Sequence, residues 1–341
     1  MTTHKSNWYN AEGDNSPIIS CRVRLARNLK KYPFLLKLDK AHAKQMIDEV
    51  VETTLKQKNF AFNYTDLSQT TKIERKSLVE YHKISVELAL SKGERGVLSS
   101  GDDTLHIMLN EEDHIRIQSI APGKNIEKAY NKANLIDNLI EQNIEYAFDE
   151  KFGYLTSCPT NTGTGMRASY MLHLPMLENE GRLPRIINSL SSFGMTIRGL
   201  YGEGTEPAGN IYQISNQVTL GKSEEEMLSS LQSITSQIVQ SELEILDNKL
   251  NKHRIAFEDK VYRAYGTLKY ARAVDVKEAR SLLSTLRVGH IAGLLKDVLE
   301  NTSIFSLMMN IEEANLRLNM GVKLADEDLD VARATYISQN L

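Results

Sequence analysis

Two hydrophobic periodicities divide the chain. From about Trp8 to Gly221, short stretches with alternating apolar and polar residues lie between longer stretches of helical spacing. The segments LHIML and HIRIQSI alternate with period two, which predicts two strands joined by the acidic turn NEED. In the second segment, Ile115 and Ile117 should lie on one face and Arg116 on the other. Strands and helices follow one another irregularly, so we expect an α+β fold with a largely antiparallel sheet rather than a doubly wound parallel one.

Other segments of this first part fit the same picture. Apolar residues at three- and four-residue spacing predict helices over 39–57 and 125–146. The β-branched stretches IISCRVRLARNL and NIYQISNQVTLG predict two more strands, the first of which leads into a basic segment.

Helical periodicity dominates from Ser223 to the C-terminus. Ser223 and Glu226 form a capping-box signature, and Asp275 and Glu278 form a second helix start. Residues 303–321 and 325–339 predict two further helices. We therefore divide the chain into a mixed α+β domain at 1–255 and an all-helical domain at 256–341. For the helical domain we expect dimerisation and a substrate-recruiting or regulatory role.

The composition narrows the class of protein. Lys plus Arg is 41 and Asp plus Glu is 44 in 341 residues, which argues against a dedicated nucleic-acid-binding surface. Two cysteines are too few for a disulfide framework and suit a reducing compartment. No apolar run approaches the roughly 20 residues of a membrane span, and no signal peptide is evident. The expectation is a cytoplasmic protein that binds neither nucleic acid nor membranes directly.

The segment CPTNTGTGMRA, from Cys158 to Ala168, allows three interpretations: a nucleophilic cysteine site, a phosphate-binding loop or a plain turn. It lacks the Gly-Lys-Ser/Thr ending of a P-loop, and Ala168 stands where a GxGxxG motif needs its third glycine. The common nucleotide-binding signatures are therefore absent from the sequence.

The segment NEEDH, from Asn110 to His114, also has two interpretations. Composition alone favours a solvated acidic turn. The alternative is a functional carboxylate pair. Because Glu111 and Glu112 are adjacent, they point to opposite sides of an extended chain, so one could bind a cation while the other abstracts a proton.

Five arginines lie on predicted strands or beside glycines. A single arginine in such a position is most often a surface residue. Arg22 and Arg24 share one strand face, and Arg167 lies beside glycines that let a backbone approach a ligand closely. Converging guanidinium groups could clamp a triphosphate without a P-loop lysine, and with magnesium this would suffice for phosphoryl transfer. The five are Arg22, Arg24, Arg116, Arg167 and Arg198.

Taken together, CRVRLARN, NEEDHIR, CPTNTGTGMRA and NIYQISN resemble the catalytic domain of the phosphagen (guanidino) kinases over about residues 15–245. The helical domain that precedes this domain in small-molecule guanidino kinases has no counterpart here. A helical C-terminal domain is present instead, and the segment RGLYGEGTE completes an arrangement that resembles the protein-arginine kinase branch of the family.

The resemblance implies an antiparallel sheet flanked by helices, as in glutamine synthetase, that binds ATP with Mg²⁺. It implies catalytic roles for Glu111, Glu112 and Cys158. A carboxylate can orient a guanidinium and take its proton, and Cys158 would be an orienting group rather than an attacking one. The implied nucleotide contacts are Ser20, Cys21, Arg22, Val23, Arg24, His82, Arg116, Arg167, Ala168, Ser169, Tyr170, Met171, Arg198, Gly199, Leu200, Tyr201, Gly202 and Glu203.

The sequence departs from the family pattern at two places. Cys21 stands where the family usually has serine. Near the C-terminus, Asp330 and Arg333 match an allosteric phosphoarginine-binding motif, but Leu329 replaces its first arginine, which removes a natural phosphate contact.

The implied activity is phosphorylation of arginine side chains in other proteins, within stress response and protein quality control. Implied partners are protein substrates, a second copy of the chain, a zinc-binding activator protein, a heat-shock repressor and a Clp-type protease. Two alternatives stay open: a small-molecule guanidino kinase and a catalytically inactive adaptor.

Overall fold

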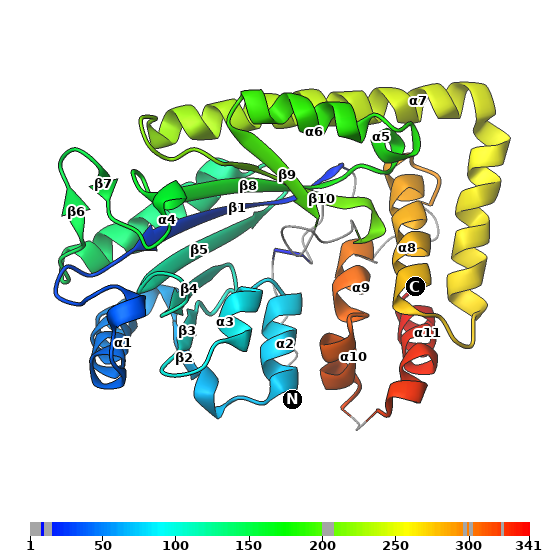
Figure 1. The fold of residues 1–341 in the computed structure, drawn as a ribbon. Coiled ribbons are helices and arrows are strands. Elements are labelled where there is room, and N and C mark those ends of the chain that lie inside the picture. Colours follow the sequence, from blue (N-terminus) through cyan, green and yellow to red (C-terminus); the bar gives the residue numbers. More distant parts are fainter. Residues whose placement is uncertain (1–7, 10–15, 200–207, 296–298, 300–302, 322–323) are drawn as a thin grey trace. The chain divides into compact units, whose positions relative to one another are not determined.

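The computed structural model describes residues 8–9, 16–199, 208–295, 299, 303–321 and 324–341. Within these residues, eight strands form one sheet in the order β2-β3-β4-β5-β1-β8-β10-β9, and β6 pairs with β7 (Figure 1). The strands are β1 (Ile18–Arg27), β2 (Asn63–Asp66), β3 (Gly96–Ser99), β4 (Leu105–Leu109), β5 (Ile115–Pro122), β6 (Phe148–Asp149), β7 (Gly153–Tyr154), β8 (Met166–His173), β9 (Met195–Gly199) and β10 (Ile211–Asn216).

Helices account for most of the other described residues. None of these helices is long and apolar enough to cross a membrane. They are α1 (Lys40–Leu55), α2 (Lys72–Glu80), α3 (Val86–Leu90), α4 (Ile126–Glu141), α5 (Pro175–Asn179), α6 (Leu183–Ser192), α7 (Glu224–Tyr270), α8 (Val276–Ile291), α9 (Ile304–Asn310), α10 (Glu313–Met320) and α11 (Leu329–Asn340).

The chain forms two compact units. Among the described residues, the first holds Trp8, Ser20–Ser169 and Ser215–Leu231. The second holds the described residues within Tyr9–Ile19, Tyr170–Ile214 and Gln232–Leu341. Strands β1, β8 and β10 contribute residues to both units. The expected domain boundary at 255/256 falls inside α7 and stays a prediction.

The first unit is built on antiparallel strands. The predicted hairpin is confirmed as β4 and β5, and β5 also pairs with β1. Arg116 lies opposite Ala26 on β1 and opposite Met108 on β4. As the alternation predicts, Ile115 and Ile117 are fully buried. Helix α4 packs against β5 (Figure 1).

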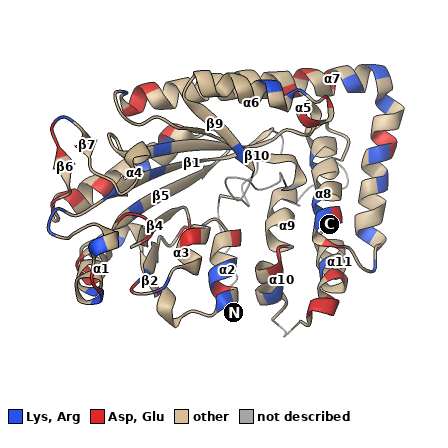
Figure 2. Ribbon diagram, viewed as in Figure 1, with Lys and Arg blue, Asp and Glu red and all other residues tan. Residues whose placement is uncertain are grey.

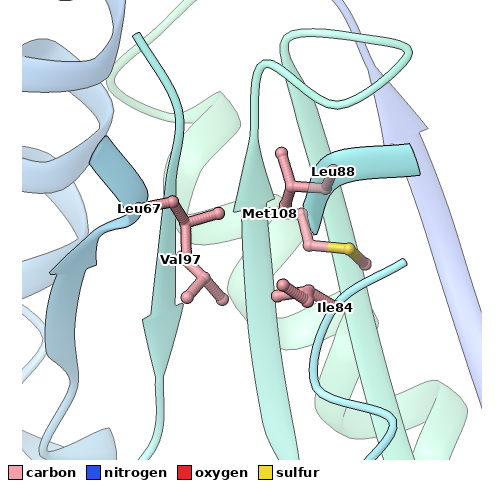
Figure 3. Packing of buried hydrophobic residues seen from close by; sticks show 5 residues of the cluster. All are labelled: Leu67, Ile84, Leu88, Val97 and Met108. Atoms are coloured by element: carbon pink, nitrogen blue, oxygen red, sulfur yellow. The ribbon is translucent and has the colours of Figure 1, made fainter. Parts of the chain in front are cut away.

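A small apolar cluster fixes α3 beside this hairpin. Val97 of β3 and Met108 of β4 pack with Leu67, Ile84 and Leu88, all of them buried (Figure 3). Because Ile84 and Leu88 flank Ser85, the cluster sets the position of the serine that caps α3. Burying side chains of this size stabilises the packing by about 1.5–3 kcal/mol each.

The predicted helix starts are present. The Ser223 hydroxyl accepts the Glu226 N–H at 3.1 Å, and Ser223 N–H donates to the Glu226 carboxylate at 2.8 Å. The Asp275 carboxylate accepts the N–H groups of Lys277 and Glu278. One prediction is wrong: 303–321 is two helices, α9 and α10, because Glu312 adopts an extended conformation (ψ 149°) between them.

Most of a long helix with a break, from Gln232 onward, belongs to the second unit. Helix α7 leaves helical geometry at His253 (φ −139°, ψ 38°). Both Lys/Arg and Asp/Glu occur along the part that follows (Figure 2), where Arg254 pairs with Glu258 and Arg263 with Asp259.

Before the break, α7 carries Glu242, which is 3% exposed. Its carboxylate accepts the N–H groups of Met176 and Leu177 at 2.7 and 2.8 Å, at the start of α5. Burial raises the pKa of Glu242 to about 7, although the two N–H groups act in the opposite direction.

Candidate active site

The acidic turn between β4 and β5 is held in one conformation. Asn110 has a left-handed backbone (φ 57°), and its N–H donates to the His114 carbonyl at 3.0 Å. His114 Nδ1 accepts the Leu29 N–H, and Nε2 donates to the Pro33 carbonyl, each at 3.0 Å. These two contacts require a neutral ring with its proton on Nε2. Burial lowers the pKa of His114, in agreement with that state.

Glu111 is a buried anion. Its Oε1 accepts from Arg116 Nη1 at 2.5 Å, and its Oε2 accepts the Glu112 N–H at 2.9 Å. The Ser85 hydroxyl, which caps α3, donates a further hydrogen bond to this carboxylate. Burial alone would raise the pKa of Glu111, but the Arg116 charge and these donors outweigh it and lower the pKa. Glu111 is therefore ionised, and both oxygens of its carboxylate accept hydrogen bonds from the protein.

Glu112 has the opposite environment. It is exposed, and the described contact of its carboxylate is a long one from Asn161 Nδ2 at 3.5 Å. Partial desolvation raises the pKa of Glu112, and the nearby carboxylates of Asp113 and Glu111 add to this effect. Two adjacent carboxyl groups with pKa values displaced in opposite directions are typical of divided catalytic roles.

Basic side chains lie close to this pair. Arg22 and Arg24 lie on one face of β1, two residues apart. Burial, together with the charges of Arg116 and Arg167, lowers the pKa of Arg22 to about 9. Burial and the same neighbours lower the pKa of Arg24. Arg24 Nε is buried without a hydrogen-bond partner among the described residues. Clustered cations with an unsatisfied donor form a site for a polyanion.

Arg167 is positioned by β10. The Ser215 hydroxyl accepts from Arg167 Nη2 at 3.1 Å and from Nε at 3.3 Å. The Asn216 side chain accepts the Ala168 N–H at 2.7 Å and donates to the Met166 carbonyl at 3.0 Å. The residues on either side of Arg167 are therefore fixed.

The remaining β1 residues are buried. Cys21 and Val23 alternate with the arginines and are 0% exposed, so their side chains point to the opposite face of the strand. Burial raises the pKa of the Cys21 thiol to about 12, and Cys21 Sγ donates to the Ala121 carbonyl at 3.5 Å. Ser20 is buried, and the Ser169 hydroxyl donates to the Arg22 carbonyl at 3.4 Å.

His82 lies near Arg22. Burial, together with the charge of Arg22, lowers the pKa of His82 to about 3. Its backbone carbonyl accepts from Gln118 at 2.7 Å, and its ring meets the Trp8 ring edge-on at 5.9 Å. The imidazole is therefore neutral.

Cys158 begins the second catalytic segment. It is a free, half-buried thiol whose Sγ lies 3.0 Å from the Thr160 hydroxyl. Further on, Gly165 has φ +64°, and a Cβ there would lie 2.6 Å from Arg27 Nη1 and 2.7 Å from the Ala26 carbonyl. Glycine is therefore required for the segment to pass this close to β1.

Several residues that were predicted to contact the nucleotide lie outside the first unit or outside the described residues. Tyr170, Met171, Arg198 and Gly199 belong to the second unit, so their nucleotide contacts stay predictions. The predicted contacts at Leu200, Tyr201, Gly202 and Glu203 lie outside the described residues.

The predicted phosphoarginine contacts, Asp330 and Arg333, are engaged with each other. Arg333 is 3% exposed and donates to Asp330 at 2.6 Å and to the carbonyls of Val274 and Ile311. An anion bound at Arg333 would have to compete with these contacts.

Sequence reasoning missed four residues of the site. Ser85 and Asn161 contact the carboxylate pair, Ser215 holds Arg167, and Asp113 accepts the Ser157 N–H at 2.6 Å. Ser85 could have been found from the sequence because serine is a preferred helix N-cap, and Asp113 because it belongs to the NEEDH motif. The other two gave no signal, because their contacts join segments distant in sequence.

An antiparallel sheet with clustered arginines beside a carboxylate pair defines the guanidino phosphotransferase class. The family model "ATP:guanido phosphotransferase, C-terminal catalytic domain" matches residues 42–245, and "Protein-arginine kinase McsB C-terminal domain" matches residues 254–341. The chain belongs to this phosphotransferase family, in its protein-arginine kinase branch.

Curated relatives cover the whole chain. A protein-arginine kinase of Caldanaerobacter subterraneus is 42% identical over 96% of this chain and 98% of its own length. That of Clostridium kluyveri is 42% identical over 100% and 97%. Among solved structures, lombricine kinase matches with a TM-score of 0.61 at 24% identity, covering 69% of this chain and 68% of that one. The duplicated taurocyamine kinase of Schistosoma mansoni has a TM-score of 0.60 at 24% identity, covering 76% and 39%.

Proposed function

We propose that this chain transfers the γ-phosphoryl group of ATP to the guanidinium group of arginine side chains in other proteins. The observation that carries the proposal is the division between the two carboxyl groups: Glu111 is buried and ion-paired with Arg116, while Glu112 is exposed and has a raised pKa. This pair suits an acceptor that is cationic and must lose a proton.

The donor half of the site is the arginine cluster. Arg22, Arg24 and Arg167 would bind the phosphate oxygens of ATP, and Ser215 would hold Arg167 toward them. The described residues contain no group of three side chains that could hold a metal ion. Mg²⁺ would therefore be held chiefly by the phosphate oxygens, as is common for this ion, and would neutralise part of their charge.

The acceptor half is the acidic turn. Glu112 would hydrogen-bond the incoming guanidinium and align one nitrogen with the γ-phosphorus. As the N–P bond forms and the bond from phosphorus to the bridging oxygen breaks, the nitrogen's proton passes to Glu112 and ADP leaves. A free guanidinium has a pKa above about 12, so removing this proton is what makes the nitrogen a nucleophile.

Two other groups would support this transfer. Cys158 and Asn161 come from one loop, and Asn161 contacts Glu112. Cys158 would orient the guanidinium by hydrogen bonding and charge rather than by forming a covalent intermediate.

The test is to incubate the purified chain with MgATP and a basic protein, and to detect phosphoarginine by mass spectrometry without acid. Glu112→Gln serves as the control. The expected result is acid-labile phosphoarginine, formed at least about 100-fold more slowly by the control. Wild type indistinguishable from Glu112→Gln would support the inactive adaptor instead. A parallel reaction with free arginine separates the small-molecule alternative, because labelling of free arginine alone would exclude a protein kinase.

Other expectations extend this proposal and rest on the family resemblance. They are a cytoplasmic location, a homodimer formed through the helical domain, a role in stress response, a zinc-binding activator, a heat-shock repressor substrate and a Clp-type protease partner. The similarity over residues 254–341 supports a family-specific role for the helical domain.

A further inference from the structure

Asn28, directly after β1, is a buried polar residue to which the proposed chemistry gives no role. It is 1% exposed, and its carbonyl accepts the Ala147 N–H at 2.7 Å. Its side-chain Nδ2 donates to Asp113 Oδ1 at 2.6 Å and to the Leu155 carbonyl at 3.1 Å. Its Oδ1 accepts the His114 N–H at 3.0 Å. An N–H can only donate and a carboxylate can only accept, so one orientation of the amide satisfies all these contacts.

These contacts join the two segments that carry the acceptor chemistry. Asp113 and His114 belong to the acidic turn, directly after Glu112. Leu155 leads into the loop of Cys158. Asp113 Oδ1 also accepts the Ser157 N–H at 2.6 Å, so the turn and the loop share one buried carboxylate oxygen. Asp113 is 2% exposed, and this oxygen is held by Asn28 from one side and by Ser157 from the other.

We propose that Asn28 is a positioning residue for phosphoryl transfer: it fixes the acidic turn of Glu111 and Glu112 to the loop of Cys158. The kinetic part of this inference rests on the proposed function. Displacing a reacting group by about 1 Å can cost about 100-fold in rate, so a link between Glu112 and Cys158 has a kinetic consequence. All three side-chain hydrogen bonds described for Asn28 go to these two segments, as expected for a residue that sets their separation.

Two variants test the link in different ways. Asn28→Leu keeps the size and removes every hydrogen bond of the side chain. Asn28→Asp keeps the acceptor for His114 but places a second carboxyl group against Asp113. Two carboxyl groups at this separation cannot both ionise easily, so they share a proton. Once protonated, the new carboxyl can donate to Asp113 again. The contact in Asn28→Asp should therefore return as the pH falls.

Three measurements distinguish positioning from simple destabilisation. The first is kcat and KM for a protein acceptor. The second is MgATP affinity by calorimetry without acceptor. The third is the rate of Cys158 alkylation by iodoacetamide, for which the buried thiol of Cys21 is an internal unreactive reference. Asn143→Asp, on an exposed residue after α4, makes the same chemical change away from the site.

The expected result for Asn28→Leu is a fall in kcat of about tenfold or more, with MgATP affinity unchanged within about twofold. The alkylation rate of Cys158 should change by at least about threefold, because the loop loses its anchor. For Asn28→Asp, kcat relative to wild type should rise as the pH is lowered from about 8 to about 6. Asn143→Asp should match wild type in every measurement.

Several outcomes would overturn the inference. One is a folded Asn28→Leu with wild-type kcat and alkylation rate. Another is a parallel loss of kcat, MgATP affinity and thermal stability, which would show a structural role only. If Asn28→Leu does not fold, a pH-independent activity ratio for Asn28→Asp refutes the link. If wild type phosphorylates no protein, the proposed function fails, while the alkylation rates still decide whether Asn28 anchors the loop.

Discussion

At the scale of single residues, the division between adjacent glutamates is the informative feature. Their sequence positions are equivalent, but Glu111 faces Arg116 and Ser85 while Glu112 faces solvent and Asn161. Substitution of the two should therefore produce different defects, one in rate and the other in stability.

Glu112→Gln should lower kcat by about 10²–10⁴-fold, because the proton acceptor is lost, while MgATP affinity stays unchanged.

The raised pKa of Glu112 also predicts a pH dependence of the wild-type activity. The base works deprotonated, so activity should fall as the pH drops through a pKa above the ordinary value of about 4.3 for glutamate. Steady-state rates from about pH 5 to 9 test both points. Wild-type turnover in the variant would remove Glu112 from the mechanism.

Glu111→Gln should act mainly on stability. It leaves the Arg116 guanidinium, which is only 16% exposed, without its 2.5 Å carboxylate partner. Breaking a buried pair from one side costs about 3–5 kcal/mol. Urea denaturation should show a lower free energy of unfolding for Glu111→Gln than for Glu112→Gln. Equal stabilities would contradict the assignment of Glu111 as the saturated partner.

Cys158→Ser should weaken transfer rather than abolish it. Serine retains a hydrogen-bonding group beside Thr160 but cannot supply a thiolate. The expected loss is about 1–2 kcal/mol of transition-state stabilisation, or about tenfold in kcat. Mass spectrometry of the reacting wild-type enzyme provides a second check, and a trapped phosphocysteine would refute the orienting role.

At the scale of elements, the glycine segment between Cys158 and Arg167 depends on its approach to β1. Arg27, buried and paired with Asp137 at 2.6 Å, donates to the carbonyls of Ala26 and Thr164. A side chain at Gly165 would collide with both Arg27 and Ala26. The path of this segment therefore depends on its close packing against β1 as well as on the backbone conformations that glycine allows.

Gly165→Ala should cost about 3 kcal/mol or more, combining left-handed backbone strain with a clash against a buried guanidinium and a carbonyl. Gly123→Ala is the matched control, because Gly123 has a similar φ of +60° with nothing within 4 Å of its added Cβ. The control should cost only the backbone strain of about 1–2 kcal/mol. Urea midpoints for both variants measure the difference, and equal losses would rule out the close approach.

The sequence predicted elements better than it predicted their contacts. Helices α1 and α4 and the hairpin of β4 and β5 had clear periodicity and are confirmed. The short α3 gave no periodic signal, because its position depends on packing against Val97 and Met108. Residues 303–321 looked continuous because their apolar spacing persists across Glu312, whose contact with Arg280 is tertiary.

At the scale of the whole molecule, buried histidines of both units should lower stability in acid, whereas a buried glutamate should raise it. Burial lowers the pKa of His173 in the second unit. In the first, burial lowers the pKa of His82 to about 3 and that of His106 to about 4. The unfolded chain binds these protons near pH 6.5, so stability is full above that pH and falls below it. Two histidines give about 2.7 kcal/mol per pH unit between about pH 6 and 4.

Glu242 in the second unit acts in the other direction. Its pKa is raised to about 7, so the native state holds a proton that the unfolded chain loses from about pH 4.5 upward. This contribution to stability is lost as the pH rises through that window. Urea unfolding between pH 7 and 4, followed by hydrogen exchange in each unit, tests both signs. His106→Gln should flatten the acid slope of the first unit, and an unchanged slope would contradict the buried neutral state.

The edge-on contact of Trp8 with His82 has a practical consequence. Trp8 is the only tryptophan in the sequence and is 2% exposed. All indole fluorescence therefore originates beside the histidine proposed to contact the nucleotide. Titrating ATP into the unlabelled protein should change the emission intensity or maximum, which gives a direct optical measure of nucleotide occupancy without acceptor, radiolabel or fusion tag.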